Sequence, residues 1–222
     1  MSALYVIATP IGNLKDLSFR ALRILKEVDL ILCEDTRVTK KLLFRYKIAK
    51  PFMSYHQHSR LAKVERISEQ LKQGKNLALV SDAGTPCISD PGAKLISYLV
   101  KHLPDLEIIP IPGPSALIAA LSVSGFSADK FVFFGFPPAK KKRKSFFEKV
   151  RRAGHTVVFY ESCHRIIKTL EELEVVQNSN IVVCRELTKK FETIYRGTVK
   201  EVIEQIKKDK IKGEFVVVVE SK

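Results

Sequence analysis

Short apolar runs alternate with amphipathic stretches along the first half of the chain. Four short, mostly apolar runs predict buried strands: Leu4 to Ala8, Leu30 to Cys33, Leu77 to Val80 and Ile108 to Ile111. Helical spacing of apolar residues predicts helices at about 17–28, 36–46, 59–72, 91–102 and 114–123. Because strands and helices alternate, we predict an α/β domain built on a mostly parallel sheet.

The second half also mixes strands and helices, in a less regular order. Strands are predicted at about 131–136, 156–160, 181–184, 193–195 and 215–219, and helices near 144–152, from 164 onward and near 199–208. The segment Ser124-Gly125-Phe126-Ser127 is typical of a boundary. We therefore predict two α/β domains, residues 1–124 with a mostly parallel sheet and residues 125–222 with a mixed sheet.

The chain is strongly basic, and both halves contribute to the excess charge. Its 38 Lys and Arg residues outnumber 24 Asp and Glu residues, which gives a formal net charge of +14. Such an excess favours a polyanionic partner, most often nucleic acid, with an anionic membrane surface second. No apolar run approaches the roughly 20 residues of a membrane span. Because the N-terminus also lacks a signal-type pattern, we expect a cytoplasmic protein.

The cysteines and histidines give no indication of a metal site or a disulfide framework. The four cysteines are far apart and form no CxxC pair: Cys33, Cys87, Cys163 and Cys184. His56 and His58 are close in sequence, but no third ligand is near them. We therefore predict reduced thiols and no bound metal.

Three loops rich in small residues directly follow predicted strands: Thr9 to Leu14, Ser81 to Gly92, and Pro112 to Ala116. Ligands of open α/β sheets bind at the carboxyl ends of the strands, and glycine lets a ligand approach the backbone closely. The sequence contains no G-x-G-x-x-G, no phosphate-binding P-loop and no G-x-S-x-G motif. The three loops therefore predict a ligand site of another kind.

The longest loop carries two aspartates with different expected roles. Asp82 directly follows a strand and is a candidate acceptor for a polar ligand. Asp90 precedes Pro91 at the start of a predicted helix, where a side-chain oxygen would cap the first turn.

Seven motifs, spread in order over nearly the whole chain, resemble a single family. They are Thr-Pro-Ile-Gly-Asn-Leu at 9–14, Cys-Glu-Asp-Thr-Arg at 33–37, the 81–92 loop, Pro-Gly-Pro-Ser-Ala at 112–116, Phe-Tyr-Glu-Ser-Cys-His-Arg at 159–165, Arg-Glu-Leu-Thr-Lys at 185–189 and Lys-Gly-Glu-Phe at 212–215. On these residues the chain resembles the small-subunit ribosomal RNA methyltransferases of the tetrapyrrole-methylase-like superfamily, the class III methyltransferases.

The resemblance implies a homodimer that uses S-adenosylmethionine to methylate the ribose 2′-oxygen of a cytidine in the decoding centre of bacterial 16S rRNA, within the 30S subunit. It also implies a fold of two α/β domains with the cofactor in a cleft between them. Carried over by motif, the residues lining the cofactor site are Pro10, Asp82, Gly84, Thr85, Ser115 and Ala116, with Tyr160 from the second domain.

Basic residues cluster between positions 140 and 152, where eight Lys and Arg residues accompany a single acidic residue, Glu148. The candidates for contact with RNA are Lys140, Lys141, Lys142, Arg143, Lys144, Arg151 and Arg152, together with Arg37 and Arg185 elsewhere. Contacts to phosphates make binding fall steeply with salt, but they do not select a base. The alternative is a solvated helix face or a flexible loop.

The sequence says least about which residues catalyse the methyl transfer. Asp35 follows a predicted strand and is a candidate general base. Alternatively, Asp35 or Thr36 caps the next helix and Arg37 is in an ion pair. Catalysis by orientation without a dedicated base is a further alternative. A second charged cluster at a strand end is Glu161 with His164 and Arg165, for which a capped helix start is the alternative. Arg185 and Glu186 form a similar pair, with binding of substrate or bracing of the dimer as its expected roles.

Two other functions stay open at this point. A methylase of a small tetrapyrrole or corrin intermediate would share the superfamily, but the first loop reads Thr9-Pro10-Ile11-Gly12-Asn13 where such enzymes usually carry a glycine-rich loop. A ribosome-binding factor without catalysis would explain the charge, but it would leave the three-loop site unused.

Overall fold

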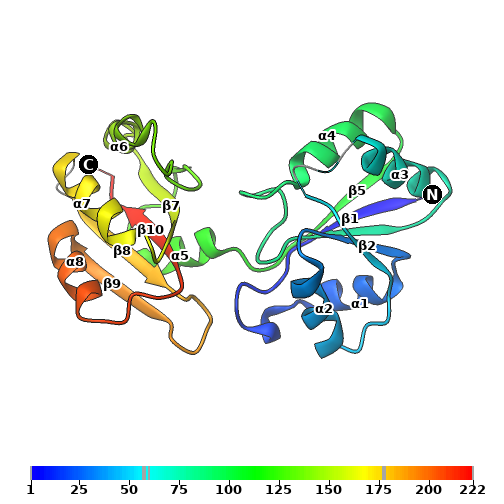
Figure 1. Cartoon of the computed structure of the whole chain (residues 1–222), viewed down its shortest axis with the longest axis horizontal. Helices are drawn as coiled ribbons and strands as arrows, with labels where there is room; N and C mark the ends of the chain where they lie inside the picture. The colour runs from blue at the N-terminus through cyan, green and yellow to red at the C-terminus, as the bar shows by residue number, and fades with distance from the viewer. Residues whose placement is uncertain (1, 57–58, 60, 177–178, 222) are drawn as a thin grey trace. The chain divides into compact units, whose positions relative to one another are not determined.

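The computed structural model describes residues 2–56, 59, 61–176 and 179–221. The chain divides into two compact units, Met1–Ser115 and Ala116–Lys222. Each unit consists of one five-stranded sheet covered by helices (Figure 1).

The first unit is built on a parallel sheet with strand order β3-β2-β4-β1-β5. Its strands are β1 (Ala3–Ile7), β2 (Leu30–Cys33), β3 (Phe52–Ser54), β4 (Leu77–Val80) and β5 (Glu107–Ile111). Its helices are the short 3-10 turn η1 (Leu14–Asp16), α1 (Phe19–Glu27), α2 (Thr36–Arg45), α3 (Leu61–Lys72) and α4 (Gly92–His102). The predicted parallel sheet of the first domain is confirmed.

Helices cover both faces of this sheet, which is why its central strands are apolar throughout. Alternate residues of one strand enter opposite cores: Ile31 packs with α1 and α2, whereas Leu32 packs with α3 and α4. Each residue of β4 is buried. The short edge strand β3 was absent from the sequence prediction, because three residues after Pro51 show no alternation of apolar and polar positions.

The second unit is built on a mixed sheet with strand order β6-β7-β10-β8-β9, in which only β6 and β7 are parallel. Its strands are β6 (Phe131–Phe133), β7 (Thr156–Ser162), β8 (Asn180–Arg185), β9 (Thr193–Thr198) and β10 (Glu214–Val219). Its helices are α5 (Ala116–Ser124), α6 (Arg143–Arg151), α7 (Ile166–Val176) and α8 (Val199–Lys207). The mixed sheet of the second domain is therefore also confirmed.

Helix α5 belongs with the second sheet, and this moves the boundary between the units. The sequence placed the boundary at 124/125, whereas the compact units divide at 115/116. Leu117, Ala120 and Leu121 of α5 pack against Val158, Val182, Val216 and Val218 on one face of the second sheet. Helices α6, α7 and α8 cover the other face, around Phe159, Val183 and Val217. The apolar pattern of α5 alone does not show that this helix packs against β10.

Candidate functional site

The three predicted loops lie side by side at the carboxyl edge of the first sheet, because β4, β1 and β5 are adjacent strands. The backbone amide of Thr9 donates to the carbonyl of Gly84 at 2.9 Å, and the amide of Gly84 donates back to Thr9 at 3.0 Å. The hydroxyl of Thr85 donates to the carbonyl of Pro114 at 3.2 Å. Backbone and side-chain hydrogen bonds thus join the three loops into one structure.

Glycine is required where these loops approach one another. Gly84 has a φ of +82°, and a Cβ atom there would lie 3.4 Å from the Cγ2 atom of Ile11. A Cβ atom on Gly113 would lie 3.0 Å from the Cβ atom of Ala8, tighter than nearly all real contacts. Both positions exclude side chains, so backbone groups line this part of the edge.

We expect Gly84→Ala to weaken cofactor binding as well as stability. A left-handed φ costs a residue with a Cβ atom about 1–2 kcal/mol, and here the new methyl group also contacts Ile11 at the loop junction. Gly74→Ala is the matched control, since Gly74 has a φ of +84° and no neighbouring atom within 4 Å. Thermal unfolding should show a similar loss for both variants, while calorimetry with S-adenosylmethionine should show weaker binding only for Gly84→Ala. Equal cofactor affinity in the two variants would contradict a ligand site at the loop junction.

Asp82 lies directly after β4, at the centre of this edge. Its Oδ1 atom accepts a hydrogen bond from the backbone amide of Asp35 at 2.9 Å, which ties the end of β4 to the start of α2. Burial raises the pKa of the Asp82 carboxyl, and the negative charges of Asp35 and Asp90 raise it further. A half-buried carboxylate among other acids is an electrostatic environment that favours a cationic ligand.

Asp90 holds the turn that leads into α4, although the N-cap position itself is Pro91, which makes no side-chain cap hydrogen bond. The Oδ1 atom of Asp90 accepts hydrogen bonds from the amides of Cys87 at 2.6 Å and Gly92 at 3.1 Å. Its Oδ2 atom is buried and has no hydrogen-bond partner among the described residues. Asp90 borders a small recess together with Glu34 and Tyr55, with room for about one water molecule.

Glu34 and Tyr55 belong to this edge, although the sequence did not single out Tyr55. Tyr55 directly follows the unpredicted strand β3. Glu34 follows β2, which was the available signal for it. Partial burial of the Glu34 carboxyl raises its pKa, and the negative charges of Asp82 and Asp90 act in the same direction.

Asp35 is the N-terminal cap of α2, the alternative that the sequence left open. Its Oδ1 atom accepts from the backbone amide of Arg37 at 2.8 Å, and its Oδ2 atom lies 2.6 Å from the Arg37 guanidinium. The hydrogen bonds from Arg37 lower the pKa of the Asp35 carboxyl to about 2. A carboxylate held ionised in this way is a poor proton acceptor, since an efficient base has a pKa near the working pH. The role of Asp35 as catalytic base stays a prediction.

The pKa of Asp35 also predicts how pH acts on stability. Because its folded-state pKa is lowered from 3.8 to about 2, its contribution is fully present above the unfolded pKa and is lost as the pH falls toward 2. Asp35→Asn keeps a capping oxygen but cannot titrate. We expect the difference in thermal midpoint between wild type and Asp35→Asn to shrink between about pH 4 and pH 2. A difference independent of pH over this range would show that ionisation of Asp35 contributes nothing.

The other residues assigned to the cofactor site in the first unit lie in the loops after β1, β4 and β5, and Ala116 lies at the start of α5. Pro10 is buried in the loop after β1, and Thr85 is half-buried in the loop after β4. Ser115 is the last residue of the first unit, and Ala116 is the first residue of α5 in the second. Contact of these residues with the cofactor stays a prediction.

Tyr160 lies in β7, within the second unit. Its backbone amide donates to the carbonyl of Gly135 at 2.8 Å, and its ring packs against Phe133 and Phe136, with centroids 4.9 and 5.4 Å away. Burial raises the pKa of its phenol. The ring of Tyr160 is thus fixed by its own unit, and its contribution to the cofactor site stays a prediction.

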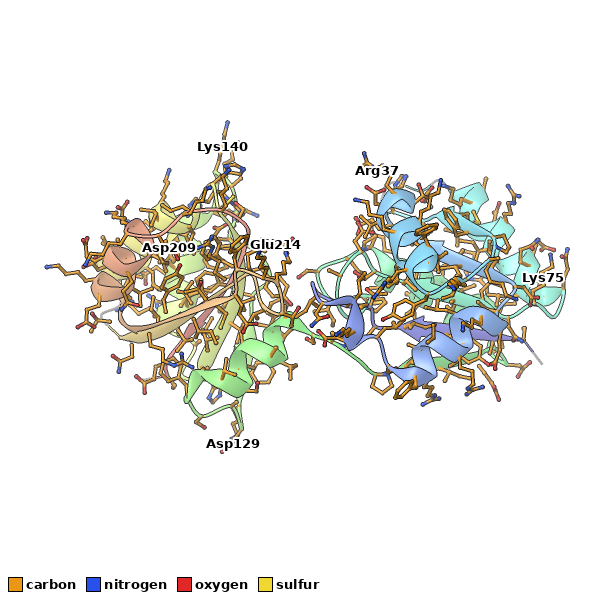
Figure 2. The ribbon with its side chains drawn as sticks, turned by 90° about the horizontal axis from the view of Figure 1, so that it is seen from below. Arg37, Lys75, Asp129, Lys140, Asp209 and Glu214 are labelled. Atoms are coloured by element: carbon orange, nitrogen blue, oxygen red, sulfur yellow. The ribbon has the colours of Figure 1, made fainter. Side chains whose placement is uncertain are left out.

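Most of the predicted basic cluster is exposed around the start of α6. Figure 2 shows Lys140 projecting outward from the second unit and Arg37 at the surface of the first. The exposed members are Lys140, Lys141, Lys142, Lys144, Lys149, Arg151 and Arg152. Arg151 forms an ion pair with Glu148 at 2.9 Å, and Arg152 approaches the same carboxylate at 3.8 Å. The lysines, four of which lie together at 140–142 and 144, are therefore the main cationic surface of this cluster.

Arg143 differs from the others, because it is buried inside the second unit with 8% of its surface exposed. Its Nε atom donates to Glu172 at 2.7 Å, its Nη2 atom to the Thr169 hydroxyl at 2.9 Å and its Nη1 atom to the Pro138 carbonyl at 2.8 Å. These internal partners occupy the guanidinium that the sequence assigned to RNA. Two of these partners, Thr169 and Glu172, come from α7, far along the chain, so the basic run alone could not reveal them.

Glu161 extends the same internal network. It is 1% exposed, accepts a hydrogen bond from the Thr169 hydroxyl at 2.7 Å and pairs with Arg165 at 2.7 Å. Arg165 also donates to the carbonyl of Pro137 at 3.0 Å. Of the predicted cluster only His164 is exposed, and Glu161 and Arg165 brace the start of α7 against the loop before α6.

Arg185 is likewise an internal residue, with 6% of its surface exposed. Its guanidinium donates to the carbonyl of Lys212 at 2.9 Å and pairs with Asp209 at 2.9 Å. Glu186 pairs with Lys189 at 2.8 Å and accepts from the backbone amide of Glu214 at 3.0 Å. The guanidinium of Arg185 is therefore directed to partners within its own unit, and contacts of this cluster with substrate or with a second subunit stay predictions.

The described residues contain no group of three or more His, Cys, Asp and Glu side chains placed to hold a metal ion. His58, part of the histidine pair considered above, lies outside the described residues. Among the residues that the structure covers, no helix has both the length and the apolar character that crossing a bilayer requires.

The chain matches known proteins over nearly its whole length. The sequence profile of the Tetrapyrrole (Corrin/Porphyrin) Methylases matches residues 3–203. The protein named Ribosomal RNA small subunit methyltransferase I of Thermotoga maritima is 42% identical over 223 residues, which cover 100% of both chains. The protein of the same name from Bacillus subtilis is 47% identical over 224 residues, which cover 99% of this chain and 75% of the relative.

Solved structures share the two-unit fold at low sequence identity. A diphthine synthase aligns with a TM-score of 0.75 at 14% identity, covering 99% of this chain and 90% of its own. A cobalt precorrin-4 methyltransferase aligns with a TM-score of 0.71 at 18% identity, covering 98% and 94% of the two chains. The family resemblance seen in the motifs is confirmed. The chain belongs to the tetrapyrrole methylase family and is an S-adenosylmethionine-dependent methyltransferase.

Proposed function

We propose that this methyltransferase modifies the ribose 2′-oxygen of a cytidine in the decoding centre of bacterial 16S rRNA, within the 30S subunit. The observation that carries the proposal is identity of 42% or more, over the full chain, to relatives named as ribosomal RNA small subunit methyltransferases. The exposed lysines at the start of α6 and the net charge of +14 support a polyanionic substrate. Such a substrate is met in the cytoplasm, and a homodimer is part of the same proposal.

The residues at the edge of the first sheet suit the proposed cofactor. When bound, S-adenosylmethionine supplies a methyl group activated by a positively charged sulfur. The half-buried carboxylate of Asp82 provides negative charge. Gly84 and Gly113 let the three loops pack closely against one another at this edge. A contribution of Tyr160, from the second domain, to cofactor binding is part of the proposal.

With the cofactor bound, the ribose oxygen would bond to the methyl carbon as the bond from that carbon to the sulfonium sulfur breaks. The sulfur would leave as a neutral thioether, and the hydroxyl proton would pass to an acceptor. Positioning of the oxygen behind the methyl group supplies up to roughly 7–11 kcal/mol of the barrier reduction, and a general base about 10²–10⁴-fold. Of the two carboxylates that follow β2, Glu34 has a pKa shifted toward neutrality and Asp35 has one shifted away from it. Of this pair, Glu34 is therefore the better matched proton acceptor.

The proposal is tested by incubating the protein with S-adenosylmethionine labelled in its methyl group and with either 30S subunits or naked 16S rRNA. We expect label in the RNA, at one cytidine, in a form that resists alkaline cleavage of the neighbouring phosphodiester because the 2′-oxygen is blocked. Label on a base, or label appearing only in a small tetrapyrrole added as competitor, would contradict the proposed substrate.

A further inference from the structure

An aromatic side chain in the second unit is exposed although it is held firmly in place. The ring of Phe136 is 53% exposed, whereas its neighbours Phe134 and Phe133 are partly buried against the two cores of the unit. One edge of Phe136 contacts Tyr160, with ring centroids 5.4 Å apart and an interplanar angle of 60°. The remaining surface of this ring is available to another molecule.

Backbone contacts fix the segment on both sides of this ring. Before it, the carbonyl of Gly135 accepts from the amide of Tyr160 at 2.8 Å. After it, the carbonyls of Pro137 and Pro138 accept from Arg165 at 3.0 Å and Arg143 at 2.8 Å. Both arginines are held by the buried network of Glu161, Thr169 and Glu172 described above. The segment is therefore anchored, and the exposure of Phe136 is a property of the folded unit.

The anchored segment leads directly into the exposed lysines. Lys140, Lys141 and Lys142 follow Phe136 within six residues, and Lys140 projects outward (Figure 2). Lys142 has a left-handed φ of +69°, a conformation that costs a residue with a Cβ atom energy and persists only where its surroundings enforce it. An exposed ring and a row of ammonium groups thus share one braced loop.

We propose that Phe136 stacks on an unpaired base of the RNA substrate while the adjacent lysines contact its phosphates. Single-stranded RNA is bound by this combination of an aromatic face and neighbouring cations, because each base has a flat face and each nucleotide a negative charge. The inference rests on the proposed function and adds a binding residue to it. It assigns Phe136 a contact with a base and leaves Arg143 and Arg165 as positioning residues for the loop.

The test compares Phe136→Ala, Phe136→Leu and Phe136→Trp with the wild type. The probes are a fluorescent single-stranded RNA of about ten nucleotides and a double-stranded RNA of the same length. Base stacking is worth about 1–3 kcal/mol, so Phe136→Ala and Phe136→Leu should bind the single strand about 5- to 150-fold more weakly. Phe136→Trp should retain wild-type affinity, and affinity for the duplex should change little. The slope of affinity against salt should stay unchanged, since no charge is removed.

Three controls separate the possible results. Phe44→Ala removes an aromatic ring that is 85% exposed in the first unit, and it should leave RNA affinity unchanged. Calorimetry with S-adenosylmethionine should give an unchanged affinity for each Phe136 variant. Weaker cofactor binding with normal RNA binding would overturn the inference by assigning the ring to the cofactor. Normal affinity of Phe136→Ala for both ligands would also overturn it, whereas wild-type protein that labels no small-subunit RNA would contradict the proposed function itself.

Discussion

Asp82→Asn is expected to weaken binding of S-adenosylmethionine by about 10- to 150-fold, the loss that accompanies removal of a charge-assisted contact worth about 1.5–3 kcal/mol. The asparagine oxygen still accepts the hydrogen bond that Asp82 receives from the amide of Asp35 at 2.9 Å, so the start of α2 keeps its tie to β4. Only the negative charge is lost. Calorimetric titration of the cofactor measures the effect directly.

The control for this variant is Asp105→Asn, which removes an exposed carboxylate from the same unit without touching the loops. Its cofactor affinity should match the wild type, and both variants should keep a wild-type thermal midpoint. Since burial raises the pKa of Asp82, cofactor affinity of the wild type should also decline on acidification earlier than an ordinary carboxylate would cause. Wild-type affinity in Asp82→Asn would remove Asp82 from the cofactor site.

Replacing Lys140, Lys141, Lys142 and Lys144 together with glutamine is expected to have the largest effect on RNA binding. Each phosphate contact with a single strand contributes about 0.7 to the slope of log affinity against log salt, so losing four contacts should reduce the slope by about three. Binding should weaken most at low salt, where the released counterions matter most. Fluorescence anisotropy over a range of salt concentrations measures both quantities.

A second quadruple variant separates a local effect from a change in total charge. Lys200, Lys207, Lys208 and Lys210 are exposed on and just after α8, and replacing them with glutamine removes the same charge elsewhere on the unit. This control should change the slope much less. Equal slopes in the two quadruple variants would show that the four lysines around the start of α6 are a solvated surface without a specific role in RNA binding. The affinity for S-adenosylmethionine should be unchanged in both variants.

Local pattern was sufficient for most of the elements and for the edge where the candidate site lies. Runs such as Leu77 to Val80 are apolar throughout because both faces of the parallel sheet are covered. The loops that follow such strands meet at one edge whatever the helices between them do. The sequence did not predict strand β3, because Phe52–Ser54 is too short to show an alternation of apolar and polar residues.

The sequence did not show which distant residues form ion pairs with its charged side chains. Arg143 stands in a run of lysines and looks like them, yet it pairs with Glu172 on α7 and is buried. Arg185 pairs with Asp209 in the same way. Asp35 and Arg37, only two residues apart, are the contrast, since their pairing and capping were among the alternatives drawn from the sequence.

The sequence by itself determined that this protein has two α/β domains, three small-residue loops at one sheet edge and a basic surface, because hydrophobic period and loop composition are local properties of a chain. Only the tertiary structure decided that α5 belongs with the second sheet, that Arg143 and Arg185 are buried in the second unit and that Phe136 is exposed near the lysines. Burial and ion pairing depend on residues brought together from distant positions, and linear order does not record which of them meet.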